Sequence, residues 1–445
     1  MHNHNTILDY LEGLRLSPTN MVSFGSDGCS TMIGRNNGVS TKFRNDNPFL
    51  LHNHCLMHRL QLCLKDLNDI LIVKKINTLI SDVYVHFCRS AKRIGELQIE
   101  QKLSGEPLLQ VPQLFEIRWL SIFACVKRLR RIYLSLLIHF EGRAKEDSFC
   151  FSIYNSLKSF EVIGFIFFLS DVAPFMEKLQ NVLESRDATY SCSMDMISSI
   201  MAHFEDNCIK EFILGENLHC LVKILSGNDK KLGKHAITFD HKFNNMRTLN
   251  PRVYKYITTL RNSVEGRFTK DPVLDAFSVL NLNNMQLLGG SNNFSTSRGS
   301  VKLETLISHY GYDITNDTSE HEAKIQSAEL RTEYSIYEKI LIKKIERSEI
   351  TKEGDLNAWL AVNASTFPNL FKLTRFGLII PAHSADCQRA FSVQNMIKTK
   401  QRSKLHIETL DWLMRISLNG PELENMKFAS AMALFAAKKK RVIFS

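Results

Sequence analysis

From about residue 118 to residue 360, apolar residues recur at the three- and four-residue spacing of amphipathic helices. Three segments show this period clearly, at 127–140, 156–179 and 320–345. The apolar run VIGFIFFL at 162–169 stops at Ser170-Asp171. It is much shorter than the roughly 20 residues of a membrane span, and it predicts a buried helix segment. The middle of the chain must therefore fold by packing helix on helix.

The first 115 residues have a different rhythm, which alternates helix and strand. The pattern predicts a helix at 6–14, a short strand at Met21–Gly25, a helix with a glycine-containing middle at Ser30–Arg44, a second strand at 50–55 and a helix at 56–67. This is an α/β pattern, although only a fragment of one.

Towards the C-terminus the helical pattern returns. The apolar segment 367–381 ends at a proline, and a helix through 383–400 follows. A last helix begins at Ile407 and ends at Asn419-Gly420-Pro421, a strong stop signal. Between the helical segments, 281–300 is rich in Asn, Gly and Ser and predicts a loop.

Composition limits the class of protein. The apolar fraction of 44% and charged fraction of 23% are ordinary for a globular protein, and 445 residues suffice for two or three domains. Ten cysteines without a repeating spacing indicate reduced, partly buried thiols and not a disulfide framework. The first residues, MHNHNTILDYL, carry neither a basic leader nor an apolar core, which argues against secretion. A net charge of +10 is compatible with a nucleic-acid partner.

The stretch FGSDGCSTMIG at 24–34 places Asp27 at the end of the predicted strand, just before Gly28. A carboxylate there can project into a cleft and bind Mg²⁺ or Mn²⁺, which prefer oxygen ligands. The alternative, favoured from this segment alone, is that Asp27 is a turn residue or helix N-cap.

The stretch HNHCLMHRLQLC at 52–63 contains Cys55 and His58 at a Cys-x-x-His spacing that can begin a zinc site. Such a site needs a second ligand pair, and the next candidates, His86 and Cys88, have the wrong order and spacing for the common zinc fingers. Structural roles at a strand end and on a packed helix are therefore favoured, and no metal site is expected.

Two basic segments are candidates for nucleic-acid binding. The first, at 115–133, combines an aromatic ring with five cations, and the second carries its cations from Arg389 to Lys404 with no acid between them. Stacking on an aromatic ring beside phosphate-binding cations is typical of nucleic-acid sites. The alternatives are a core tryptophan with a solvated basic face, and an exposed helix surface. The candidates are Arg118, Trp119, Lys127, Arg128, Arg130 and Arg131 in the first segment and Arg389, Lys398, Lys400 and Arg402 in the second.

Together these segments resemble the hAT superfamily of cut-and-paste DNA transposases and the cellular proteins descended from them. The matching segments span about 24–423 and occur in the family's order. The last one is the most specific and resembles the hAT C-terminal dimerisation region. In order, they are SDGCSTMIGRNNGV, HCLMHRLQL, IRWLS, the KDPVLDAFSVLNL region and IPAHSADCQRAFSVQNMIKTKQRSKLHIETLDWLMRISLNGPEL.

The resemblance implies an α/β fold plus a large all-α insertion, that is, a partial ribonuclease-H-like core interrupted by a helical domain. It divides the chain into a core with its first strands missing (1–115), a helical insertion (116–360), C-terminal core helices with the dimerisation region (361–425) and a basic tail (426–445). It also identifies Trp119 with the family's tryptophan that stacks at a DNA hairpin end. Cys55 and His58 match the family's Cys-x-x-His, as a structural or DNA-proximal motif.

Active members of the family hold two Mg²⁺ or Mn²⁺ ions with three acidic residues. The second acid corresponds to Asp27. No counterpart is found before Asp27 for the first acid, for its strands or for the family's N-terminal zinc-finger domain. The third acid immediately precedes the arginine of the family's C-E-R-[AG]-F-S motif, which is the position of Gln388 here. Glutamine supplies no charge, so one carboxylate would face roughly +4 of metal charge. Asp386 does not replace it, because two helical residues are about 200° apart.

The sequence therefore predicts a transposase-derived protein without catalytic activity, which keeps one of three catalytic acids and binds no cofactor. We expect it to dimerise and to associate with DNA or chromatin in the nucleus, where Lys438–Arg441 could serve as an import patch. The alternative is a truncated gene model or fragment of an active hAT-type transposase, which cleaves and transfers DNA strands with metal ions. A third hypothesis is that the chain is a fragment of a decayed transposable element without a selected function.

The last helix predicts that the chain associates with itself, as a homodimer or a higher oligomer. Apolar residues at three-residue spacing are interpreted as one stripe along this helix. The alternative is that the stripe is buried against the rest of the same chain. We also expect DNA and nuclear proteins as partners, and we expect no contact with a membrane. The stripe consists of Ile407, Leu410, Leu413 and Ile416.

Overall fold

The computed structural model describes residues 2–114, 121–185, 188–211, 215–225, 231–237, 249–282, 296–316 and 319–438. Its contacts divide the chain into two units, Met1–His383 (unit 1) and Ser384–Ser445 (unit 2). The described residues are mostly helical and contain three two-stranded sheets, in agreement with the predicted large helical portion. No described helix combines the length and apolarity needed to cross a membrane.

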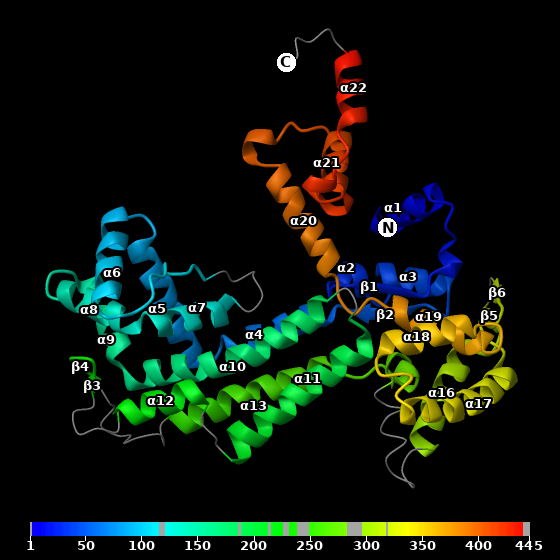
Figure 1. The fold of residues 1–445 in the computed structure, drawn as a ribbon, viewed down its shortest axis with the longest axis horizontal. Helices are drawn as coiled ribbons and strands as arrows, with labels where there is room; N and C mark the ends of the chain where they lie inside the picture. Colours follow the sequence, from blue (N-terminus) through cyan, green and yellow to red (C-terminus); the bar gives the residue numbers. More distant parts are fainter. Residues whose placement is uncertain are drawn as a thin grey trace. The chain divides into compact units, whose positions relative to one another are not determined.

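Unit 1 begins with a small α/β part whose two strands are parallel neighbours (Figure 1). The predicted strands and the helix after them are confirmed with small shifts of their ends. The single helix predicted at Ser30–Arg44 is wrong, because the chain turns between Gly34 and Gly38. The elements are α1 (His2–Gly13), a 3-10 turn (Pro18–Asn20), β1 (Ser23–Ser26), α2 (Ser30–Ile33), α3 (Val39–Asp46), β2 (Leu51–His54) and α4 (Leu56–Leu67).

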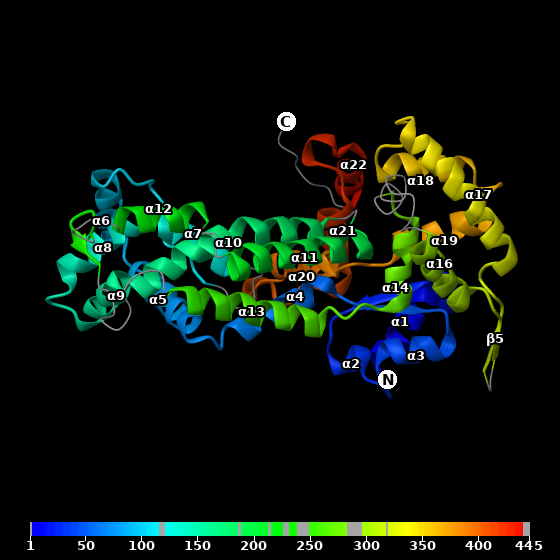
Figure 2. The same cartoon turned by 90° about the horizontal axis from the view of Figure 1, so that it is seen from below.

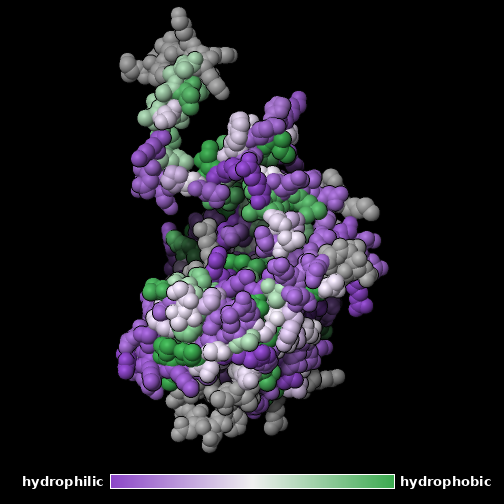
Figure 3. All heavy atoms as spheres, turned by 90° about the vertical axis from the view of Figure 1, so that its right-hand side faces the viewer, coloured by the Kyte–Doolittle hydropathy of each residue, from purple (hydrophilic) through white to green (hydrophobic). Residues whose placement is uncertain are grey.

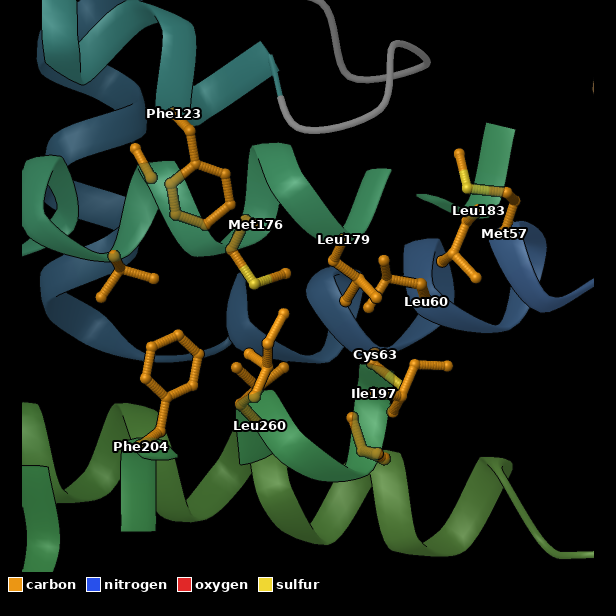
Figure 4. Close-up of a cluster of buried hydrophobic side chains, with 14 of the residues drawn as sticks. Met57, Leu60, Cys63, Phe123, Met176, Leu179, Leu183, Ile197, Phe204 and Leu260 are labelled. Atoms are coloured by element: carbon orange, nitrogen blue, oxygen red, sulfur yellow. The ribbon is translucent and has the colours of Figure 1, made fainter. Parts of the chain in front are cut away.

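The helical body of unit 1 is built around α10 (Phe160–Glu184) (Figures 1 and 2). This helix packs against α7 (Ser121–Arg131), α11 (Tyr190–Phe204), α12 (Glu216–Leu225) and α13 (Leu249–Arg267). Figure 4 shows side chains of α4, α7, α10, α11 and α13 meeting in one core, with Met176 and Leu179 of α10 at its centre. The remaining elements are α5 (Leu71–Phe87), α6 (Ala91–Leu103), α8 (Tyr133–Arg143), α9 (Ser148–Lys158), a π-helix (Glu205–Lys210), β3 (Lys231–Leu232) and β4 (His235–Ala236).

Two helices predicted as continuous are each divided in the structure. The segment 127–140 breaks at Ile132, between α7 and α8, and the segment 156–179 breaks at Ser159, between α9 and α10. The run at 162–169 is helical and buried, as predicted.

The last part of unit 1 is also helical. The helix predicted at 320–345 begins only at Ser327, and residues 319–321 form a strand instead. Of the predicted loop at 281–300, residues from Thr296 are helical, and 283–295 lie outside the described residues. The elements are α14 (Pro272–Ala276), a 3-10 turn (Phe277–Leu280), α16 (Thr296–Tyr310), β5 (Ile314–Asn316), β6 (Ser319–His321), α17 (Ser327–Glu346), α18 (Glu353–Val362) and α19 (Pro368–Ile379).

Unit 2 consists of helices with little buried surface. Among its described apolar residues, only Ala385 and Leu410 are buried. Its elements are α20 (Ala385–Ile397), a 3-10 turn (Lys400–Arg402), α21 (Ile407–Asn419), a second turn (Leu423–Asn425) and α22 (Ala429–Lys438).

Candidate functional site

The two parallel strands end at the same edge, where the sequence-predicted polar residues of unit 1 gather. Ser26 pairs with His54 at the end of the register, so Asp27 and Cys55 are the first residues after the strands. The Cys55 amide donates to the Ser26 carbonyl oxygen at 2.8 Å, which locks the two strand ends together. Residues at the carboxyl ends of neighbouring parallel strands are well placed to act jointly.

Gly28 is required by the geometry of this edge. A Cβ atom built on Gly28 would lie 2.5 Å from Cε1 of His54, closer than side-chain carbons can approach. The turn after β1 therefore closes directly onto the His54 imidazole, which only glycine allows at this position.

Asp27 is exposed and acts as a turn residue. Its Oδ1 accepts a hydrogen bond of 3.3 Å from the Cys29 amide, at the N-cap of α2. Hydrogen bonding with Cys29 lowers the pKa of Asp27, and this effect outweighs the opposing effect of partial burial. This hydrogen bond makes Asp27 part of the turn between β1 and α2.

The other polar groups of the edge are imidazoles. Burial, followed by the charge of Arg59, lowers the pKa of His54 to about 4, so that ring is neutral at physiological pH. The ring of His58 lies 5.4 Å from that of His54, and Cys55 is buried.

This set of groups does not match a two-metal site. Mg²⁺ and Mn²⁺ favour a shell of oxygen ligands, whereas this edge offers one carboxylate, a thiol and imidazole nitrogens. Among the described residues, no group of three or more His, Cys, Asp and Glu side chains is arranged to hold a metal ion.

Two hydrogen bonds connect this edge to residues Pro381 and Ala382, and nothing in the local sequence predicts them. Asn53, fully buried in β2, donates from Nδ2 to the Pro381 carbonyl oxygen at 2.7 Å, and the Leu56 amide donates to the Ala382 oxygen at 3.1 Å. A Cβ atom on Gly25 would lie 2.7 Å from Cγ of Pro381, so this segment packs tightly on β1 as well.

In unit 2, Gln388 is exposed on the first turns of α20. Asp386, the acid considered as its substitute, accepts a hydrogen bond of 2.6 Å from the Arg389 guanidinium one turn further on. That carboxylate is therefore paired within its own helix and lies about 200° from the position of residue 388.

The basic residues of α7 divide into two pairs. Lys127 donates to both Glu177 oxygens at 2.9 Å, and the Arg130 guanidinium lies 6.0 Å from the centre of the Phe167 ring, so both contact α10. Arg128 and Arg131 are exposed and remain accessible to phosphates. Arg118 and Trp119 lie outside the described residues.

The basic run of unit 2 is more open. Lys398, Lys400, Arg402 and Lys404 are all exposed, and within the described part of the chain none of them forms an ion pair. Four cations within seven residues create a local positive field with no acid to neutralise it.

The four apolar residues predicted for dimerisation do not share one face of α21. A three-residue step advances about 300°, so three such steps place Ile407 and Ile416 about 180° apart. Leu410 is 5% exposed, whereas Ile407 is 74% and Ile416 54% exposed.

Sequence reasoning also missed the most prominent exposed aromatic residue of α21. Trp412 is 63% exposed, in the same unit as Phe391 (63%) and Met396 (71%). The available signal was its position next to Asp411, which is paired with Arg415 on the polar side of the helix.

Comparison with known families adds one match. Residues 337–419 match the model of the hAT family C-terminal dimerisation region. This range covers α18, α19, α20 and α21 and includes both Gln388 and Trp412. Through these residues the chain carries a hAT dimerisation region, consistent with a protein related to hAT-family transposases.

Proposed function

We propose that this chain is a transposase-derived protein that self-associates, binds DNA through exposed cations and lacks strand-transfer activity. The proposal is carried by the matched dimerisation region and by Gln388, which stands where the resemblance to hAT transposases places the third acid. The chain would then act as a DNA- or chromatin-associated scaffold and not as a nuclease.

The absence of catalysis is proposed from the chemistry of the acids. The Asp27 carboxylate interacts with Cys29, His58 and His54, none of which supplies a second negative charge near it at neutral pH. Asp386 is paired with Arg389. Without a second carboxylate, two divalent cations would remain largely uncompensated, and we expect the protein to bind no cofactor.

The parallel β1–α3–β2 arrangement supports the related proposal of a partial ribonuclease-H-like core. Its second strand leads directly into α4, and the helical body follows, as expected for a core interrupted by a helical domain.

DNA association is proposed from the accessible cations. Lys398, Lys400 and Arg402 in unit 2, and Arg128 and Arg131 on α7, are exposed. Cations that are not paired with protein carboxylates can displace counterions from the phosphate backbone, which favours binding without sequence readout. A nuclear location would fit this partner and the basic residues that begin at Lys438.

Catalysis is tested with purified full-length chain and labelled duplex DNA in Mg²⁺ or Mn²⁺. We expect no strand cleavage by the wild type or by the Asp27→Ala variant. Metal-dependent cleavage by the wild type that disappears in Asp27→Ala would refute the proposed inactivity and favour the alternative of an active transposase fragment.

DNA binding is tested with a Lys398→Gln/Lys400→Gln/Arg402→Gln variant. Removing three phosphate contacts should weaken binding and lower the slope of log affinity against log salt by about 3. The matched control is Lys92→Gln/Lys102→Gln/Lys145→Gln, which removes three exposed charges elsewhere. An equal loss in both variants would show a response to net charge alone.

A further inference from the structure

Trp412 and Ile416 form an exposed apolar ridge on α21. Trp412 is 63% and Ile416 54% exposed. Residues four apart on an α-helix lie about 40° from each other around the axis, so the two side chains are neighbours on one face. Figure 3 shows that unit 2 exposes further hydrophobic residues along α22 (upper left). Because aromatic residues are enriched in the buried centre of protein interfaces, the ridge is a candidate contact surface.

A groove adjoins this ridge, because Ile416 is also one of its lining residues. Its volume is about 380 Å³, and its walls come from α20, from α21 and from the residues after Gly420. The apolar part of the lining includes Ile397, Leu413 and Leu423. Trp412 does not line the groove of its own chain. Apolar pockets of this kind hold the large anchor side chains of protein interfaces.

Two polar residues in the lining of the groove favour an indole ring as its occupant. The Arg402 guanidinium can stack on the face of a tryptophan ring, whose π electrons attract cations. The Ser417 hydroxyl can accept a hydrogen bond from the indole N–H, which acts only as a donor. A stacked guanidinium keeps its positive charge, so this contact is compatible with the DNA association proposed for Arg402.

We propose that Trp412 of one chain inserts into this groove on a second copy of the chain, and that the contact is reciprocal. Trp412 and the groove walls from Ile397 to Ser417 lie inside the matched dimerisation region, residues 337–419, which identifies the second copy as the partner. A two-fold interface pairs one surface with itself. The ridge and the groove share Ile416, so one surface of each copy presents both the inserted ring and its receptor. The inference rests on the proposed self-association and adds the surfaces that form it.

The first test measures the dimer dissociation constant of the full chain by sedimentation equilibrium. Trp412→Glu changes the ridge and Leu423→Lys changes the groove. Trp412 is 63% and Leu423 74% exposed, so folding should be retained. We expect each substitution to weaken dimerisation at least tenfold, because each brings an unpaired charge into an apolar contact. Leu103→Glu, at an 83% exposed leucine of α6, is the control and should leave the constant unchanged.

The second test separates contact between chains from contact within one chain. In an equal mixture of Trp412→Glu and Leu423→Lys proteins, the mixed dimer keeps one native contact between Trp412 and the groove. Its other contact pairs glutamate with lysine. The mixture should therefore associate more tightly than either protein alone. A chain carrying both substitutions should also recover association.

The third test follows Trp412 in the wild-type chain, which has three tryptophans. As the protein concentration rises through the dissociation constant, the fluorescence emission should move to shorter wavelength, because the indole ring leaves water. Trp412→Phe keeps an aromatic ring at this position and the other two tryptophans. This variant should still dimerise, but its emission should not shift with concentration.

Three outcomes would overturn the proposal. Recovery in the doubly substituted chain without recovery in the mixture would place Trp412 in the groove of its own chain. A wild-type dimer that neither substitution weakens, and whose emission does not shift, would overturn the insertion of Trp412 and leave self-association intact. A wild type that stays monomeric at every concentration would overturn self-association as well.

Discussion

Helix α10 of unit 1 and helix α22 of unit 2 are similar in apolar character, but the two units differ in where their apolar side chains lie. α10 buries 15 of its 25 residues. In contrast, α20 and α21 bury one residue each, Ala385 and Leu410, and the described side chains of α22 are all exposed. The apolar side chains of α10 form part of the core of unit 1, whereas most of the described apolar side chains of unit 2 are not buried. The two regions should therefore respond differently to the same kind of substitution.

The largest effect is expected for truncation in the centre of α10. Phe165 is fully buried and packs edge-on against Tyr256 of α13, with ring centres 5.6 Å apart. Phe165→Ala should lower the free energy of unfolding by about 3–5 kcal/mol, because it removes buried surface and leaves a cavity. Urea unfolding followed by circular dichroism measures the change. Met396→Ala, at a 71% exposed residue of α20, is the control, and a comparable loss there would erase the contrast between the regions.

The next effect concerns a buried carboxylate that joins two helices of unit 1. Glu333 of α17 is 7% exposed and accepts hydrogen bonds from the Asn369 side chain at 2.7 Å and from the Leu370 amide at 2.9 Å, at the start of α19. Glu333→Ala should cost about 2–3 kcal/mol in unfolding free energy, since these donors lose a charged acceptor. Glu338→Ala, on the same helix, is the control and should change stability little. Equal effects would show that the bonds to α19 contribute nothing.

A third effect is a loss of stability in acid, produced by His86. Its ring is 2% exposed, and its Nε2 lies 3.0 Å from Nε2 of His139. Burial, followed by the charges of His139, Arg93 and Arg143, lowers the pKa of His86 from 6.5 to about 4, against the weaker pull of Asp147. Between these values the unfolded chain binds a proton that the folded chain does not, so stability is present at neutral pH and falls as the pH drops below about 6.5.

At pH 5 this linkage should remove about 2 kcal/mol of the unfolding free energy relative to pH 7.5. His86→Gln cannot take up the proton, so the difference in stability between the two pH values should shrink by that amount in urea titrations. An unchanged difference would assign the acid sensitivity to other groups, among which His52 and His54 also have their pKa values lowered to about 4 by burial.

Local patterns predicted the strands, α4 and the buried character of α10, because alternation, helical period and glycine punctuation are properties of neighbouring residues. The break before α8 has a distant cause. The Glu106 carboxylate accepts hydrogen bonds from the Leu134 amide at 3.0 Å and the Ser135 amide at 2.9 Å, and so caps α8 from 28 residues away. Nothing in the continuous apolar period around Ile132 indicates this cap.

The candidate site shows the same limit. The position of Asp27 after a strand followed from the sequence, but the approach of Gly28 to His54 and the contact of Asn53 with Pro381 depend on tertiary packing. The partners of Lys127 and Arg130 on α10 were likewise invisible in the basic pattern of α7. The divergence of Ile407 from Ile416 is the exception, because helix geometry alone predicts it.

The smallest effect on folding is expected for Ile407, which can be compared with Leu410 on the same helix. Ile407 is 74% exposed, so Ile407→Ala should change the unfolding free energy by no more than about 0.5 kcal/mol. Leu410→Ala, one turn away at a 5% exposed residue, should cost about 2 kcal/mol or more and serves as the internal reference. Thermal unfolding and sedimentation equilibrium of both variants separate folding from association.

If Ile407→Ala weakens dimerisation while its unfolding stays unchanged, that side chain belongs to the contact between chains. If it destabilises the fold as much as Leu410→Ala, the outer face of α21 is packed within its own chain, and the contrast with α10 disappears.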